Sequence, residues 1–291
     1  MGNRLQWDVD GRDWPNRAWS RFVTVRRLRW HVQVSPGHGE TALLIHGTGA
    51  STHSWRDLAQ ILATQYRVVA MDLPGHGFTA PLPAGSASLP VIVRELQALL
   101  DHLGLEPQLA IGHSAGAAIA ARMVLDGMLK PRAIVSLNGA LLPLPGLSGT
   151  IFPPVAKLLA ANSLAARMFA WRAADPAAVR RLVASTGSTL DRDGLAYYGR
   201  LIRSPAHVAG TLQMMAGWDL AALRRDLPRL SVPMLMIVGL QDGTVSPAEA
   251  DRMLRVLPQT KVVRLAGLGH LAHEEQAATV ARGIAEFVAG L

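Results

Sequence analysis

The stretch Gly112-His113-Ser114-Ala115-Gly116 lies between an apolar run at residues 109–111 and a helical pattern at residues 117–125. A Gly-x-Ser-x-Gly turn between a strand and a helix strains the backbone at the central Ser, and its two glycines remove side chains that would collide there. In a chain with 27 Gly the pattern also arises by chance, so it needs the right structural context. The strand–turn–helix setting supplies that context and predicts that Ser114 exposes its hydroxyl at one edge of a sheet. A plain turn serine is the alternative.

A serine hydroxyl becomes a nucleophile when a base takes its proton and a carboxylate orients that base. Two later loops offer these partners. Asp242 follows an apolar run at residues 233–238, and His270 follows a second run at residues 261–265. Because the carboxyl ends of parallel strands meet at one edge of a sheet, the sequence predicts a catalytic triad of Ser114, His270 and Asp242.

Thr48 and Ala115 are the candidate oxyanion hole. The stretch His46-Gly47-Thr48-Gly49 follows an apolar run at residues 42–45, and its glycines let the backbone approach a ligand closely. The backbone N–H groups of Thr48 and Ala115 are the natural pair to hold a developing oxyanion. One such donor contributes about 3 kcal/mol of transition-state stabilisation.

Other residues of these loops have competing interpretations. His273 is an alternative base, expected in the helix after His270 and pointing elsewhere. Residues 270–275 hold two His and two Glu, which is compatible with a metal site, but the triad explains the position better, so neither a metal nor a cofactor is expected. Asp72 is interpreted as fixing a turn. Three histidines beside glycines are expected to be hydrogen-bonded structural residues: His46, His76 and His113.

Short apolar runs alternate with helical patterns along most of the chain. The runs predict strands at residues 22–25, 28–34, 42–45, 67–71, 109–111, 133–137, 233–238 and 261–265. The later runs are continuously apolar, as expected for strands covered on both faces. The clearest helical pattern spans residues 88–103, with Ser88 as N-cap and Gly104 after its end. The alternation predicts an α/β fold: a mostly parallel eight-stranded sheet, helices on both faces, and an antiparallel hairpin at one edge.

Residues 141–217 break this alternation, because they show helical patterns and no strand. The patterns lie at residues 155–170, 176–185, 196–202 and 208–216. We expect this insertion to be a helical lid over the carboxyl ends of the strands, where open α/β sheets bind their ligands. The predicted domains are a core of residues 1–140 and 218–291 and a lid of residues 141–217.

The composition of the 291-residue chain excludes several classes of protein. Without cysteine it has no disulfide scaffold, thiol nucleophile or cysteine-based metal site. The net charge is +8, but the basic residues are spread out and only 5% of residues are aromatic, so nucleic-acid binding is not expected, whereas contact with an anionic ligand or a membrane surface stays open. The longest uncharged run, residues 133–156, holds four prolines and does not predict a membrane-spanning helix. With no apolar leader, a cytoplasmic protein is the default expectation.

The predicted triad loops together resemble the α/β-hydrolase superfamily, in which the catalytic residues follow in the order Ser, Asp, His. Further stretches resemble one subfamily, the hydrolase-like proteins encoded among bacteriochlorophyll-biosynthesis genes and labelled magnesium-chelatase accessory protein or 30 kDa subunit. They lie at residues 10–17, 28–33, 46–56, 72–78, 112–118, 186–189 and 214–220. The resemblance covers nearly the whole chain and implies a role on the tetrapyrrole branch, with magnesium chelatase as a candidate partner. The sequence contains no Gly-x-x-x-x-Gly-Lys-Ser/Thr loop of the kind that ATP-using chelatase subunits carry.

Two hypotheses of different class follow. In the first, the chain is a serine hydrolase in which Ser114 attacks an ester or related carbonyl of an apolar substrate. A porphyrin that bears carboxylates suits both the resemblance and the basic charge. In the second, the chain binds a porphyrin without turnover, as an accessory factor of the chelatase. A third keeps the site but changes the reaction to carbon–carbon hydrolysis or cofactor-free peroxidation, because a fold does not dictate its reaction.

Overall fold

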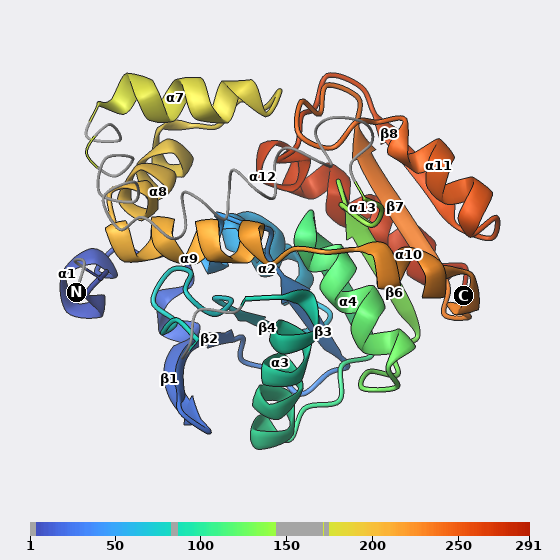
Figure 1. The fold of residues 1–291 in the computed structure, drawn as a ribbon, viewed down its shortest axis with the longest axis horizontal. Coiled ribbons are helices and arrows are strands. Elements are labelled where there is room, and N and C mark those ends of the chain that lie inside the picture. Colours follow the sequence, from blue (N-terminus) through green and yellow to red (C-terminus); the bar gives the residue numbers. More distant parts are fainter. Residues whose placement is uncertain (1–3, 83–86, 144–170, 172–174) are drawn as a thin grey trace.

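One sheet of eight strands forms the centre of the protein (Figure 1). The computed structural model describes residues 4–82, 87–143, 171 and 175–291. The strands are β1 (Ser20–Val25), β2 (Leu28–Val34), β3 (Thr41–Ile45), β4 (Arg67–Met71), β5 (Leu109–His113), β6 (Ala133–Leu137), β7 (Met234–Gly239) and β8 (Lys261–Leu265). Their order in the sheet is β1-β2-β4-β3-β5-β6-β7-β8, with β1–β2 and β2–β4 antiparallel and all other pairs parallel. The predicted mostly parallel eight-stranded sheet with an edge hairpin is confirmed.

Helices cover both faces of this sheet, as predicted. One face carries α3 (Leu89–Leu103), α4 (Ala115–Leu125), α10 (Ala221–Asp226) and α11 (Glu249–Val256), and the other carries α2 (Arg56–Leu62) and α13 (Ala277–Ala289). Side chains of β3 alternate between the two layers: Leu43 and Ile45 pack with α3 and α4, whereas Ala42 and Leu44 pack with α2 and α13. This alternation is the two-residue period of a strand. It explains why strands covered on both faces are apolar throughout.

The last strand departs from this pattern. β8 is at the edge of the sheet, and all five of its residues are at least partly exposed. The expectation that the later strands are covered on both faces is therefore wrong for β8. Lys261 and Arg264 are exposed along it, and such charges discourage an edge strand from pairing with another chain.

Helix α3 begins and ends where the sequence predicts. Ser88 is its N-cap in extended conformation, although its side chain makes no capping hydrogen bond. Pro90 is tolerated in the first turn, because N–H groups there lack helical partners. Gly104 ends the helix in the left-handed conformation, with a φ of 61°, and its N–H closes on the carbonyl groups of the last turn.

Helices α7 (Pro176–Ser185), α8 (Arg192–Ile202) and α9 (Pro205–Ala216) belong to the predicted lid. Figure 1 shows them together at one end of the molecule. Each has an N-cap residue whose side chain accepts a hydrogen bond from an N–H group of the first turn. These residues are Asp175 for α7, Asp191 for α8 and Ser204 for α9. The helix predicted at residues 155–170 lies outside the described residues, and the division into core and lid domains stays a prediction. Among the helices that the structure describes, none is both long and apolar enough to cross a membrane.

The start of α4 leaves no room for a side chain at Gly116, because a Cβ there would overlap the carbonyl oxygen of Ile45 in β3. We expect Gly116→Ala to lower the free energy of unfolding in urea by about 1–3 kcal/mol, the usual cost of overpacking. Gly283→Ala in α13 is the matched control, because its Cβ would meet only Ile237 Cδ1 at 3.5 Å. Alanine there should stabilise the helix by up to about 1 kcal/mol. Equal effects of the two substitutions would contradict this packing.

Candidate active site

Ser114 lies in a strained turn between β5 and α4. Its φ is 51° and its ψ is −117°, values that a residue other than glycine rarely adopts. The turn closes because Gly112 and Gly116 carry no Cβ; one added at Gly112 would overlap the backbone of Ala117. Ser114 is partly exposed, whereas the four other residues of the motif are buried. The backbone thus leaves this serine accessible at the carboxyl edge of the sheet.

His270 and Asp242 form the hydrogen-bonded pair that the predicted triad requires. His270 Nδ1 lies 2.8 Å from Asp242 Oδ2. The other carboxylate oxygen accepts the N–H of Thr244 at 2.7 Å and of Val245 at 2.8 Å, and the side chain of Asp242 is fully buried. A carboxylate accepts hydrogen bonds, so Nδ1 carries the proton and Nε2 is the acceptor of the neutral imidazole. Asp242 therefore fixes both the orientation and the tautomer of His270.

Asn138, directly after β6, is a partner of this pair that sequence reasoning missed. Its Nδ2 donates to Asp242 Oδ2 at 2.8 Å and to the carbonyl oxygen of Gly269 at 3.3 Å. Asn138 has a φ of 46°, in the left-handed region that Asn tolerates better than most residues. Its position after a parallel strand was a usable signal, because the ends of such strands meet at the site. Asn138 ties the loop of Asp242 to the loop of His270.

His113 links the turn at Ser114 to the loop of the base. Its Nε2 lies 2.9 Å from the carbonyl oxygen of His270, and the two rings are 4.7 Å apart. Burial lowers the pKa of His113 well below its usual value, and the neighbouring His273 and His270 lower it further, so the ring is neutral and donates from Nε2. The structural role expected for His113 agrees with this contact. Within the described structure Ser114 Oγ makes no hydrogen bond to His270, so proton transfer between them stays a prediction.

The loop after β3 runs against the turn at Ser114. A Cβ at Gly47 would lie 2.9 Å from Ser114 Cβ, which leaves room only for glycine. Thr48 follows, partly exposed, with its hydroxyl 3.6 Å from Met214 Sδ in α9. Ala115 begins α4, where N–H groups lack helical partners and the helix dipole favours negative charge. The two loops come together as expected, while the oxyanion role of Thr48 and Ala115 stays a prediction.

Two further histidines beside these loops have backbone partners. His46 Nδ1 lies 2.7 Å from the carbonyl oxygen of Gly47, and its Nε2 accepts the N–H of Leu73 at 2.8 Å. His76 Nδ1 lies 3.1 Å from the carbonyl oxygen of Pro74. These contacts agree with the structural roles expected for both residues.

The alternative base, His273, lies in the short helix α12 (Ala272–Glu275) and is buried. Its ring is 4.8 Å from that of Trp55 and 4.4 Å from that of His113. Burial, and then the neighbouring His270, lower the pKa of His273 to about 3. Because Asp242 pairs with His270, the geometry favours His270 as the base. In the described part of the chain, no group of three or more His, Cys, Asp or Glu side chains is placed to hold a metal ion.

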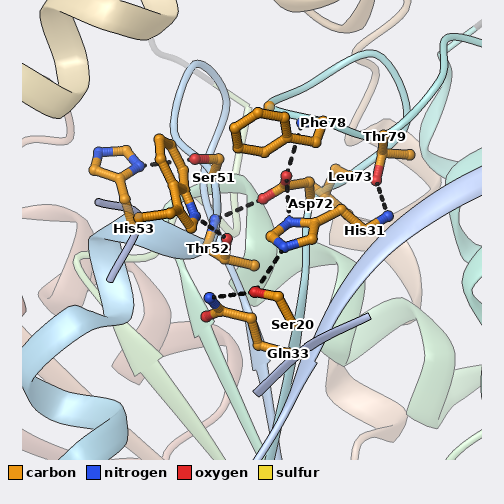
Figure 2. Close-up of polar contacts among 12 residues, drawn as sticks. Ser20, His31, Gln33, Ser51, Thr52, His53, Asp72, Leu73, Phe78 and Thr79 are labelled. Carbon is orange, nitrogen blue, oxygen red and sulfur yellow. Dashed lines mark hydrogen bonds and ion pairs between the residues drawn. The ribbon is translucent and has the colours of Figure 1, made fainter. Parts of the chain in front are cut away.

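Asp72, directly after β4, fixes two loops, as expected (Figure 2). Its Oδ1 accepts the N–H of Thr52 at 2.7 Å, and its Oδ2 accepts the N–H of Phe78 at 2.9 Å. The same Oδ2 lies 2.8 Å from His31 Nδ1. Burial alone would raise the pKa of Asp72, but the charge and the hydrogen bond of His31 outweigh it and hold the pKa below its usual range.

The side chains of Ser20, His31 and Asp72 are hydrogen-bonded in a row. We call this row the second Ser–His–Asp chain; the sequence analysis did not identify it. His31 Nε2 lies 3.0 Å from Ser20 Oγ, which also accepts a hydrogen bond from Gln33 Nε2 at 3.1 Å (Figure 2). Ser20 has an ordinary extended backbone, with a φ of −76° and a ψ of 134°, and it begins a strand rather than a helix. The helix N–H groups that lie beside Ser114 therefore have no counterpart at Ser20. We interpret this second chain as structural.

A buried carboxyl group joins the predicted lid to the loop of the base. Tyr198 of α8 donates its hydroxyl proton to Glu274 Oε1 at 2.7 Å. Burial raises the pKa of Glu274 to about 8, although the hydrogen bond from Tyr198 lowers it. Glu274 follows His270 by four residues, so the contact connects α8 to the segment that carries His270.

A sequence profile of the alpha/beta hydrolase fold matches residues 42–277. The chain belongs to the α/β-hydrolase family. Among its curated relatives, the magnesium-chelatase 30 kDa subunit of Rhodobacter capsulatus is 37% identical over 279 residues, 96% of this chain and 97% of that protein. A pimeloyl-[acyl-carrier protein] methyl ester esterase of Vibrio cholerae is 29% identical over 272 residues, 89% of this chain and 97% of that protein. The resemblance to the α/β-hydrolase superfamily and the resemblance to the magnesium-chelatase 30 kDa subunits are both confirmed.

Solved structures share the fold of this α/β-hydrolase. An alpha/beta hydrolase fold protein from Burkholderia ambifaria has a TM-score of 0.78 at 20% identity, over 98% of this chain and 100% of that chain. A thermophilic esterase from Thermogutta terrifontis has a TM-score of 0.73 at 21% identity, over 93% of this chain and 98% of that chain. At these identities the likeness concerns the fold alone.

We expect this α/β-hydrolase to lose stability as the pH rises through the titration of Glu274. Its pKa is raised from an ordinary value of 4.5 to about 8. Between these values the folded protein binds more protons than the unfolded chain, so the free energy of unfolding falls as the pH rises. Glu274→Gln keeps an acceptor for Tyr198 and cannot ionise. The free energy of unfolding of the variant, relative to that of the wild type, should therefore rise by on the order of a few kcal/mol when the pH is raised from about 5 to about 8.

Urea denaturation at both pH values measures this gain. Glu286→Gln, at an exposed position of α13, is the matched control and should show none. A difference between Glu274→Gln and the wild type that is the same at both pH values would rule out the titration of Glu274 as its cause.

Proposed function

We propose that the protein is a serine hydrolase in which Ser114 is the nucleophile, His270 the general base and Asp242 the group that orients the imidazole. The hydrogen bond from His270 Nδ1 to Asp242 Oδ2 is the observation that supports this most directly. It keeps the proton on Nδ1, so that Nε2 can take the proton of a serine hydroxyl. The strained turn at Ser114 offers such a hydroxyl at the same edge of the sheet.

In the proposed reaction, Ser114 Oγ bonds to the carbonyl carbon of an ester while His270 takes the hydroxyl proton. The N–H groups of Thr48 and Ala115 stabilise the oxyanion. The intermediate collapses as His270 gives the proton to the leaving alcohol, and the acyl group stays on Ser114. Water then attacks the acyl carbon, with His270 again as the base, and releases the carboxylic acid and the free serine.

The relatives support an ester or related carbonyl of an apolar substrate. Several are named as methyl ester esterases, and the 37% identical relative is named as a magnesium-chelatase subunit. We therefore place the proposed substrate on the magnesium-tetrapyrrole branch of bacteriochlorophyll biosynthesis, with a porphyrin ester as the leading candidate.

We expect Ser114→Ala to abolish both labelling by a fluorophosphonate probe and hydrolysis of p-nitrophenyl butyrate. Asp242→Asn should lower kcat by on the order of 10⁴-fold, because His270 loses the partner that sets its tautomer. Ser20→Ala, which removes the hydroxyl of the second Ser–His–Asp chain, is the matched control and should react like the wild type. Full activity of Ser114→Ala would show that this mechanism is wrong.

A non-catalytic role is the second candidate, and the name of the magnesium-chelatase relative favours it. In that role the protein binds a porphyrin, or the chelatase itself, without turnover. Titration with Mg-protoporphyrin and its monomethyl ester, followed by absorbance and product analysis, separates the two candidates. Tight binding without product, unchanged by Ser114→Ala, would favour the accessory factor. Ester hydrolysis that is lost in Ser114→Ala would favour the enzyme.

A further inference from the structure

Residues 186–189, with the sequence Thr-Gly-Ser-Thr, lie in the segment between α7 and α8 and have no role in the proposed reaction. We call them the lid connector. We infer that the lid connector positions Asp242 and His270 relative to each other, so that the predicted lid is built into the catalytic geometry as well as covering it. This inference rests on the proposed function of these two residues.

A single carbonyl group of the lid connector joins the two loops. Thr186 O accepts the N–H of Gly243 at 3.0 Å and the N–H of His270 at 3.1 Å. Gly243 is the residue after Asp242, so one atom holds the backbone on each side of the acid–base pair. The 2.8 Å separation of His270 Nδ1 and Asp242 Oδ2 is thus set by two loops bonded to a common acceptor.

The lid connector holds the loop of the base at two further points. Ser188 Oγ accepts the N–H of Leu271 at 2.8 Å. The N–H of Thr189 donates to Glu275 Oε1 at 2.9 Å, and Oε2 of the same carboxylate accepts the N–H of Gly269 at 2.9 Å. Three successive residues of this loop are therefore bonded to the lid connector, either directly or through one side chain.

Glycines bring the three segments into direct backbone contact. Gly187 has a φ of 78°, and a Cβ there would overlap the carbonyl oxygen of Gln241. A Cβ at Gly269 would overlap the backbone of Gly187. A Cβ at Gly243 would lie 2.6 Å from the carbonyl oxygen of Ser185. Because no side chain separates these segments, a displacement of the lid connector is passed on to the loops of the acid and the base.

Gly187→Ala tests the inference, because its Cβ must push the lid connector away from Gln241. We expect kcat for p-nitrophenyl butyrate to fall by on the order of 10²-fold, the cost of misplacing catalytic groups by about 1 Å, with KM changed less than about threefold. Gly127→Ala is the matched control. Gly127 has a φ of 72° and open space around it, so this substitution brings the same backbone strain without the contact. It should keep the kcat of the wild type.

Proton NMR gives a readout that does not depend on turnover, because histidine–carboxylate hydrogen bonds have protons far downfield of the other signals. Within the residues that the structure describes, two such bonds of 2.8 Å occur, His270–Asp242 and His31–Asp72. Asp242→Asn assigns the first by removing its signal. In Gly187→Ala we expect this signal to shift or broaden while the His31–Asp72 signal, an internal reference, stays unchanged. In Gly127→Ala both signals should match the wild type.

Ser188→Ala is the second variant, for the case that Gly187→Ala does not fold. It removes the acceptor for Leu271 N–H and should lower kcat by up to about tenfold, because one hydrogen bond stabilises a given position of the loop by roughly that factor. Ser185→Ala is its control, because that hydroxyl bonds to the Leu182 carbonyl oxygen within α7.

Lower kcat together with a displaced His270–Asp242 signal supports the inference. Wild-type kcat and unchanged signals in both connector variants overturn it. If Ser114→Ala keeps full activity, the proposed function fails, and the NMR comparison still decides whether the lid connector positions the pair.

Discussion

The close approach of the turn at Ser114 to β3 is the constraint on which the rest of the site depends. Gly116 lies so near the carbonyl oxygen of Ile45 that no side chain fits between them. This packing holds Ser114 at a φ of 51° and starts α4 immediately after it. The first N–H groups of that helix therefore lie beside the serine. Gly47, whose loop runs against the same turn, packs on the side chains of His113 and Ser114, where a further Cβ does not fit.

The two Ser–His–Asp chains of the protein differ in backbone rather than in residue type. Each contains a His–Asp hydrogen bond of 2.8 Å to a fully buried carboxylate. Ser20 begins a strand in relaxed, extended conformation, and its hydroxyl also receives a hydrogen bond from Gln33. Ser114 occupies a strained turn ahead of a helix, where N–H groups are available to an oxyanion. Strain and helix placement, more than composition, distinguish a candidate nucleophile from a structural serine.

Much of the fold could be predicted because a strand covered on both faces needs an unbroken apolar run, as β7 has. The loops of Asp242 and His270 could be predicted because parallel strands end at one edge of a sheet. Asn138 was missed because its role depends on how closely the loop after β7 approaches it. The partners His31 and Asp72 are 41 residues apart, and pairing of β2 with β4 brings their strands together. The exposure of β8 was missed although Lys261 and Arg264 in its sequence were a usable signal, because charged side chains are typical of edge strands.

The sequence by itself determined the fold class, the number of strands and the loops in which the candidate nucleophile, base and acid lie. These features follow from local patterns of apolar residues and glycines, which act over a few neighbouring positions. Only the tertiary structure decided that the lid connector bonds to the loops of both Asp242 and His270, that Tyr198 reaches Glu274, and which His–Asp pair is bonded to His113, the neighbour of the strained serine. Those contacts join residues far apart in the chain, so their distances depend on how sheet, turn and lid helices pack together.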